Sequence, residues 1–185
     1  FRRLVQERGY YDVFLINHEG TVVYSVFKEA DFATSLESGR WRDSDLGAVD
    51  RAVVSDFSSG EVAFTDFRPY APSNGAAASF IAAPVFDQAG EPHGVLVFQM
   101  PIGRINGIMQ SSAGMGETGE SYLVGEDLLM RSDSRFSEAS TILERRVDTE
   151  PVQLALSGRH GHAMATDYRG VEVISAYAPF EFMGA

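Results

Sequence analysis

Cysteine is absent from the 185 residues of the chain. Without thiols the chain can form neither a disulfide bond nor a cysteine-type zinc site, and it has no thiolate nucleophile. Long hydrophobic runs are also missing, because no apolar stretch approaches the ~20 residues that span a bilayer, and no signal-peptide pattern is present. Cationic residues are few, with 15 lysines and arginines against 26 acidic residues and a net charge of −11. Since these cations are scattered, the sequence argues against nucleic acid or an anionic membrane surface as a partner.

The remaining composition is typical of a folded, globular chain. Hydrophobic residues make up 44% of the sequence and aromatic residues 11%, which is enough for one good core or two small ones at this length. The chain opens on Phe1 rather than on a methionine. We therefore expect it to be a fragment excised from a longer protein.

A four-residue motif occurs in both halves of the chain. Residues 65–68 read Thr-Asp-Phe-Arg, and residues 166–169 read Thr-Asp-Tyr-Arg. A strand-like run that ends in Ala-Pro follows each copy. Each copy is typical of two antiparallel strands joined by a turn. A repeat this long predicts two related lobes.

Hydrophobic periodicity and turn residues predict the elements of the first lobe. Alternating apolar residues predict strands at 10–17, 21–26, 61–67, 78–86 and 94–100. Ser44 is a suitable N-cap for a helix whose apolar stripe runs from Leu46 to Phe57 and which ends at residues 58–60. Pro101 opens a second helix that reaches Gln110. Residues 28–43 show no period and predict a long loop over the sheet, of the kind that often holds ligands.

The second lobe repeats this order in a shorter form. We expect strands at 120–124, 128–132, 162–168 and 171–179, with a helix that begins near Pro151 and ends at Gly158. By comparison with the first lobe, a final strand is expected after Phe180. We therefore expect that the C-terminus is also cut.

Four stretches together resemble a known family of sensor domains. They are Tyr-Tyr-Asp-Val-Phe-Leu-Ile-Asn from Tyr10, Val-Phe-Lys-Glu-Ala-Asp-Phe-Ala-Thr-Ser-Leu from Val26, Asp-Phe-Arg-Pro-Tyr at 66–70, and Gly-Glu-Thr-Gly-Glu-Ser-Tyr-Leu-Val-Gly from Gly116. These stretches resemble double Cache domains, the extracytoplasmic, PAS-like ligand-binding regions of bacterial chemoreceptors, sensor kinases and some membrane cyclases. The resemblance covers nearly the whole chain.

The resemblance implies an α+β fold of two PAS-like (Cache) lobes, each a central antiparallel sheet flanked by helices. It implies that residues 1–9 end a long N-terminal stalk helix. Residues 10–112 would form a membrane-distal, ligand-binding lobe, and residues 113–185 a membrane-proximal lobe truncated before its last strand. We expect no cofactor.

The resemblance also implies a parent receptor anchored in the cell membrane by flanking transmembrane helices and homodimeric at full length. This domain would then lie in the periplasm or outside the cell. A methyl-accepting chemotaxis receptor is the first expectation for the parent. A histidine kinase or a membrane adenylate or guanylate cyclase is the second, and a ligand-free PAS-type interaction module is the third.

The first lobe holds the residues that we expect to contact a small solute of the amino acid, amine or carboxylate class. They combine aromatic rings with a few polar groups, as small-molecule pockets do. They are Tyr24, Lys28, Trp41, Asp66, Arg68, Tyr70, Phe80 and Gln99. These residues converge only if the first strand is central in the sheet and the fifth strand lies beside it.

Each predicted site residue has a chemical role and a competing structural one. Asp66 would hold an ammonium group, and Lys28 or Arg68 a carboxylate. However, Asp66 and Arg68 belong to the repeated motif, so both could be structural corner residues, and Phe80 and Tyr24 could be core residues. Around residue 41 the chain reads Arg-Trp-Arg, which departs from the Arg-x-Trp-Tyr pattern of one amino-acid-binding branch of the family. This departure argues against a plain amino-acid ligand.

Two further patterns match functional motifs only in their letters. Residues 114–119 match G-x-G-x-x-G, but they follow a helix and precede a strand, so they predict a linker rather than a dinucleotide loop. His160 and His162 could place two imidazoles on one side of a strand, but no adjacent Cys or Asp supports a metal site, and a polar turn is the simpler interpretation. No Ser or Asp lies in a catalytic context such as Gly-x-Ser-x-Gly, so we expect no enzyme activity.

Overall fold

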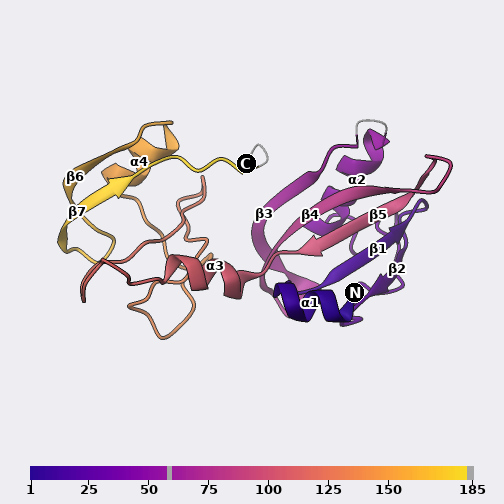
Figure 1. Ribbon diagram of the computed structural model, residues 1–185, viewed down its shortest axis with the longest axis horizontal. Coiled ribbons are helices and arrows are strands. Elements are labelled where there is room, and N and C mark those ends of the chain that lie inside the picture. The colour runs from indigo at the N-terminus through magenta and orange to yellow at the C-terminus, as the bar shows by residue number, and fades with distance from the viewer. Residues whose placement is uncertain (58–59, 183–185) are drawn as a thin grey trace. The chain divides into compact units, whose positions relative to one another are not determined.

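The computed structural model describes residues 1–57 and 60–182 (Figure 1). The predicted helix end at residues 58–59 and the last three residues of the predicted second lobe lie outside the described residues. The elements are α1 (Arg2–Arg8), β1 (Val13–Asn17), β2 (Val22–Ser25), α2 (Asp45–Ser55), β3 (Ala63–Tyr70), the 3-10 helix η2 (Ala71–Ser73), β4 (Ala76–Phe86), β5 (Pro92–Gln99), α3 (Ile102–Met109), α4 (Glu150–Leu156), β6 (Gly161–Thr166) and β7 (Glu172–Tyr177).

The described residues divide into two compact units, 1–102 and 103–182. The boundary between the two units lies at the start of α3, whereas the sequence predicts a boundary after residue 112, beyond this helix. Side-chain contacts account for the earlier change. Asn106 of α3 and Asp133 exchange two hydrogen bonds of 2.6 and 2.8 Å, which tie the helix to the second unit.

Among the described residues, five strands of the first unit form one antiparallel sheet in the order β2-β1-β5-β4-β3. β1 lies inside the sheet, paired with β2 on one side and β5 on the other. Gly94 allows β5 to approach β1 closely, because a Cβ at this position would lie 2.2 Å from the carbonyl oxygen of Ile16. This order confirms the arrangement that the predicted site requires.

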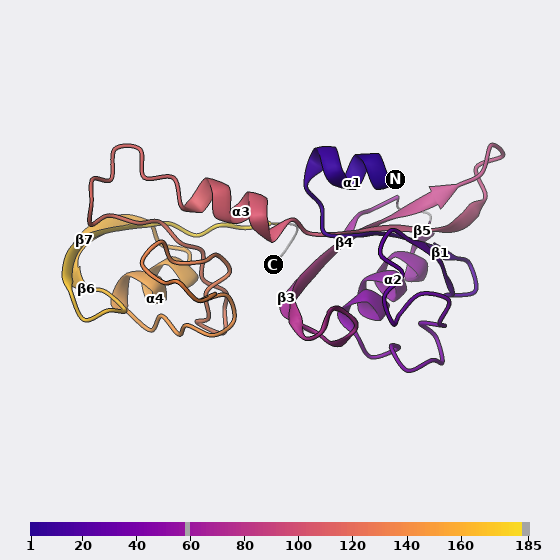
Figure 2. The same cartoon turned by 90° about the horizontal axis from the view of Figure 1, so that it is seen from below.

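α2 covers one face of this sheet, and α1 lies over the other (Figure 2). α2 begins as the sequence predicts, because the Ser44 Oγ accepts a 3.2 Å hydrogen bond from the Gly47 N–H and caps the helix. Its apolar stripe packs on the sheet in a core that includes Phe14, Phe80 and Val97. The helix ends at Ser55, earlier than predicted. The core of the first unit therefore lies between α2 and the sheet.

The second unit has less regular structure than the sequence predicts. β6 and β7 pair antiparallel, and α4 packs on both. The segments 120–124 and 128–132 pair with each other as the sequence predicts, but only over a short stretch: Val124 and Met130 form an antiparallel bridge, flanked by the backbone hydrogen bonds Gly125 N–H to Leu129 O (3.0 Å) and Arg131 N–H to Leu123 O (2.8 Å). Met130 also bonds through its backbone to Arg145 and Leu143, so a later segment lies against the other side of this short hairpin.

Among the described residues, each helix is too short or too polar to cross a bilayer.

Candidate functional site

A buried carboxylate and a phenol meet beneath the long loop of the first unit. Asp31, in this loop, has none of its surface exposed, and its Oδ2 accepts a 2.6 Å hydrogen bond from the hydroxyl of Tyr70 at the end of β3. Burial raises the pKa of Asp31. Burial and the adjacent carboxylate also raise the pKa of Tyr70. Tyr70 therefore remains a neutral phenol that donates a hydrogen bond to Asp31.

Several buried side-chain oxygens, Oδ1 of Asp50 on α2 among them, have no hydrogen-bond partner among the described residues, and two of them belong to the residues around this site. These two are Oδ1 of Asp31 and Oε1 of Gln99, the last residue of β5. Gln99 lies opposite Phe80 in the β4–β5 register, and the Phe80 ring packs on the Tyr70 ring at a centroid distance of 4.9 Å. Buried acceptors are normally paired, and leaving one unpaired is costly. The two oxygens therefore mark where a donor from outside the chain would be stabilised.

Trp41 adds a third ring to this group and holds the loop in place. Its indole N–H donates a 3.0 Å hydrogen bond to the carbonyl oxygen of Ala30, next to Asp31. The Arg40 guanidinium lies over the Trp41 ring, 4.5 Å from the ring centroid. Only 9% of Trp41 is exposed. The ring therefore belongs to the core of the unit.

Two more carboxylates fasten the base of the loop to the sheet. Glu29 accepts hydrogen bonds from the hydroxyls of Tyr11 (3.0 Å) and Ser73 (2.6 Å). Asp12 is fully buried and accepts three backbone hydrogen bonds, from the N–H groups of Val13, Val26 and Phe27. Burial raises the pKa of Asp12, and the negative charges of Glu29 and Asp12 add to the raised pKa of Asp31. This end of the loop is therefore strongly negative and favours a cation.

Four of the eight predicted site residues belong to this group: Trp41, Tyr70, Phe80 and Gln99. All four are buried, so the aromatic wall expected to face a solute is a packed part of the core. The sequence analysis missed Asp31. The available signal was an acidic residue inside a long, aperiodic loop, the kind of segment that often holds ligands.

Tyr24 and Lys28 lie apart from this group. Tyr24 is half-buried on β2, and its ring packs on Phe1 at a centroid distance of 5.6 Å. Lys28 is exposed, with its ammonium group 5.1 Å from the ring centroid of Phe32. The structure therefore gives both side chains local packing contacts.

Asp66 and Arg68 lie on β3, at an edge of the sheet. The Asp66 carboxylate accepts a hydrogen bond from the N–H of the next residue, and the exposed Arg68 forms a 3.7 Å ion pair with Asp45 at the start of α2. In the second copy of the motif, Arg169 and Asp167 pair directly at 2.7 Å. The structural alternative for the repeated motif is thus realised in its second copy, whereas Arg68 pairs with a helix residue.

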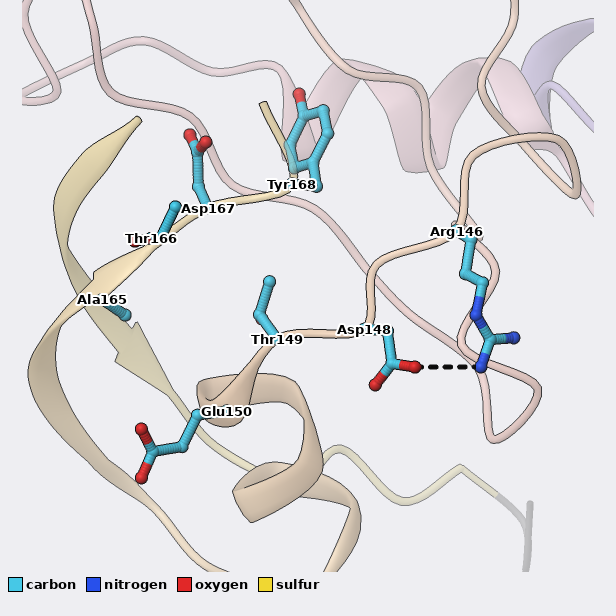
Figure 3. Close-up of a pocket in the computed structure, with 8 residues that line it drawn as sticks. All are labelled: Arg146, Asp148, Thr149, Glu150, Ala165, Thr166, Asp167 and Tyr168. Atoms are coloured by element: carbon cyan, nitrogen blue, oxygen red, sulfur yellow. Dashed lines mark hydrogen bonds and ion pairs between the residues drawn. The ribbon is translucent and has the colours of Figure 1, made fainter. Parts of the chain in front are cut away.

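A cavity of about 570 Å³ lies in the second unit, next to α4 and β6 (Figure 3). Its one guanidinium, from Arg146, is bonded to Asp148 at 3.1 Å. Figure 3 shows that the carboxylates of Glu150 and Asp167 point away from Asp148, so the three acids do not converge. Within 1–57 and 60–182, no group of three or more His, Cys, Asp or Glu side chains is placed to hold a metal ion. This cavity has no feature that selects a ligand.

Comparison with known proteins places the fold. No model of a known protein family matches the sequence, and a search of curated proteins finds no match. Among solved structures, the extracellular domain of mmHK1S-Z2, named as a histidine kinase, has a TM-score of 0.57 at 18% identity, covering 96% of this chain and 73% of its own. The ligand-binding domain of the amino acid chemoreceptor PctC of Pseudomonas aeruginosa PAO1, in complex with GABA, has a TM-score of 0.55 at 16% identity, covering 92% and 67%.

A third structure, an extracellular ligand-binding receptor from Desulfohalobium retbaense, has a TM-score of 0.50 at 12% identity and covers 85% of this chain but 26% of its own. At such identities the similarity shows the fold alone. The chain has the mixed α+β fold of these extracellular domains. This confirms the predicted fold class.

Proposed function

We propose that this chain is the extracytoplasmic sensing domain of a bacterial membrane receptor and that its first unit binds a small organic amine. The observation that carries the proposal is the buried, unpartnered Oδ1 of Asp31. A carboxylate oxygen without a donor in a negatively charged, water-excluding environment favours a cationic donor, because a charge-assisted hydrogen bond is roughly twice as strong as a neutral one.

The surrounding groups fit an ammonium ion better than an anion. The rings of Tyr70 and Phe80 offer faces that attract a cation. The free Oε1 of Gln99 can accept a second N–H from the same group. The group contains no buried cation that would bind a carboxylate. This agrees with the departure of Arg40-Trp41-Arg42 from an amino-acid-binding pattern, and it is why we propose an amine rather than a plain amino acid.

Binding requires that the loop at residues 26–44 opens, since Asp31, Phe80 and Gln99 are closed off from solvent. The contacts of Asp12, Glu29 and Trp41 hold the loop down in the state seen here. A ligand that binds the open or re-closed state more tightly would shift the population between the two states. Flanking helices of the parent would carry that shift across the membrane.

For the parent we propose a homodimeric, membrane-anchored methyl-accepting chemotaxis receptor with two Cache lobes. The GABA complex of the chemoreceptor PctC supports an amine-bearing ligand and this class of parent. The likeness to the histidine kinase mmHK1S-Z2 supports a sensor kinase as the second candidate. The output region of the parent, outside this chain, would distinguish them.

A thermal-shift screen tests the proposal. The panel contains ethanolamine, putrescine, GABA, L-amino acids and the N-acetyl derivative of each amine. A ligand at 100 times its dissociation constant adds about 2.7 kcal/mol to the free energy of unfolding. We expect stabilisation by at least one free amine and none by its N-acetyl form, and loss of the effect in Asp31→Asn.

Asp43→Asn is the matched control, because Asp43 is an exposed carboxylate at the end of the same loop. It should bind like the wild type. If no amine stabilises the protein, the ligand-free interaction module is the better assignment. If Asp66→Asn abolishes the effect and Asp31→Asn does not, the site lies at β3 instead.

A further inference from the structure

A second cavity, of about 330 Å³, lies within the second unit, well away in sequence from the loop of the amine site. It is large enough for one small molecule. Its lining contains two guanidinium groups, two aromatic rings and four hydroxyls, and no acidic side chain: Ser134, Phe136, Ser137, Thr141, Arg145, Tyr168 and Arg169. In a chain with a net charge of −11, this lining carries cationic side chains and no acidic one.

The two arginines of this cavity differ in their partners. Arg169 is already neutralised, by Asp167 at 2.7 Å and Glu120 at 3.9 Å, and its guanidinium lies 4.3 Å from the Phe136 ring centroid. Arg145 is exposed and forms no ion pair or side-chain hydrogen bond with any of the described residues. Its guanidinium lies 5.9 Å from the ring centroid of Tyr168. Arg169 is therefore held in place by its two carboxylate partners. The N–H groups of the Arg145 guanidinium remain available to a ligand.

The hydroxyls of the lining are mostly committed to the protein. The Ser134 Oγ bonds to Glu120 at 2.8 Å and to the Tyr168 hydroxyl at 2.7 Å, and the Ser137 Oγ donates to a backbone carbonyl oxygen. The Thr141 Oγ1 accepts from the Ser134 N–H. The donors left for a ligand are therefore those of Arg145, beside two ring faces.

We propose that this cavity is a second ligand site and that it binds a small carboxylate anion. Arg145 forms a bidentate, charge-assisted pair with the carboxylate, a geometry that the guanidinium fork matches and a lysine ammonium does not. The apolar part of the ligand lies against Phe136, 42% of which is exposed, and Tyr168. The site has the opposite charge preference to the amine site and does not depend on it.

Isothermal titration of the whole chain tests this site with propionate, succinate and benzoate as probes. Propionamide and benzamide serve as uncharged probes of the same shape, and inorganic sulfate as an anion without an apolar part. We expect at least one carboxylate to bind and the amides not to bind. Arg145→Ala should weaken the binding of that carboxylate by about tenfold or more, and Arg145→Lys should retain only part of the wild-type affinity.

Arg159→Ala is the matched control, because Arg159 is an exposed arginine of the same unit outside the cavity lining. It should bind like the wild type. Amide NMR signals of Phe136 and Thr141 should shift on titration, whereas that of Asp31 should not. Asp31→Asn should leave carboxylate binding intact, which separates this site from the amine site.

Three results would overturn the proposal. One is the absence of carboxylate binding tighter than about 10 mM. Another is equal loss of binding in Arg145→Ala and Arg159→Ala. The third is sulfate binding as tight as that of the best carboxylate, which would mean a general anion site without recognition of an organic acid.

Discussion

The hydroxyl of Tyr70 donates a 2.6 Å hydrogen bond to Oδ2 of Asp31, although 39 positions separate the two residues. This bond joins the end of β3 to the long loop of the first unit. It leaves Oδ1 of the same buried carboxylate without a partner among the described residues. One carboxylate thus holds the loop closed and presents the acceptor on which the proposed amine site depends.

Removing this hydrogen bond should destabilise the first unit. Tyr70→Phe keeps the ring that packs on Phe80 but leaves a buried carboxylate with fewer partners, so the free energy of unfolding should fall by about 1–3 kcal/mol. Urea denaturation measures the change. Tyr11→Phe is the control, since it removes a phenol hydrogen bond to Glu29 at a residue that is 40% exposed. Equal losses in the two variants would contradict the role given to the Tyr70–Asp31 bond.

Phe80 should carry a large share of the core energy. It is fully buried and contacts the rings of Phe14 and Tyr70, so Phe80→Ala should cost about 3–5 kcal/mol. Phe86 lies on the same strand with 42% of its surface exposed. Phe86→Ala should therefore cost much less. A small effect at Phe80, measured in the same denaturation assay, would mean that the core is not packed as described.

Asp50 on α2 should make stability fall as pH rises. Only 2% of Asp50 is exposed, and burial raises its pKa from 3.8 to about 6, with Arg51 opposing and Glu37 adding to the shift. Between about pH 4 and pH 6 the folded state therefore binds more protons than the unfolded state. The contribution is present in full below about pH 4 and is lost as pH rises through about 6, a difference of up to about 3 kcal/mol.

Asp50→Asn removes this titration. Relative to the wild type, the variant should gain free energy of unfolding between pH 4 and pH 7, as measured by denaturation at both pH values. Other carboxyls titrate equally in both proteins and cancel in this comparison. A wild-type-to-variant difference that stays constant with pH would show that Asp50 keeps an ordinary pKa.

Trp41 should report the opening of the loop. It is the single tryptophan of the chain, it is 9% exposed, and its indole N–H is bonded to Ala30. We expect a stabilising amine to change the wavelength or intensity of its fluorescence in the wild type but not in Asp31→Asn. Propionate, the probe for the second unit, should leave the emission unchanged. A response to propionate alone would place the ligand-coupled motion elsewhere.

Local signals in the sequence predict much of the first unit. Ser44 is followed by an apolar stripe, which is sufficient to place the start of α2. Alternating apolar residues and turn glycines predict the strands, and the position of β1 beside β5 follows from the family resemblance. The segment at 120–132 is different, because only a short hairpin forms within it and its further backbone partners come from residues 143–147. Such non-local pairing leaves no periodic signal in either segment.

The candidate site was predicted in part for the same reason. Phe80 and Gln99 lie on strands, where the register places them opposite each other. Asp31 lies in an aperiodic loop, where no pattern distinguishes a buried carboxylate from a solvated one. Only the fold shows that its surface is fully covered. The sequence favoured Asp66 as the ammonium ligand, although its repeated motif also fitted a structural role, and in the second copy of the motif Asp167 pairs with Arg169.

The most direct test of the amine site is isothermal titration, at pH 7, of the amine that stabilises the protein most, with wild-type protein and Asp31→Asn. We predict that the substitution weakens binding about tenfold or more, because it removes the charge from the hydrogen bond to the ammonium group. We also predict that the N-acetyl form of the amine does not bind the wild type. Equal affinity of the two proteins for the free amine would contradict the account.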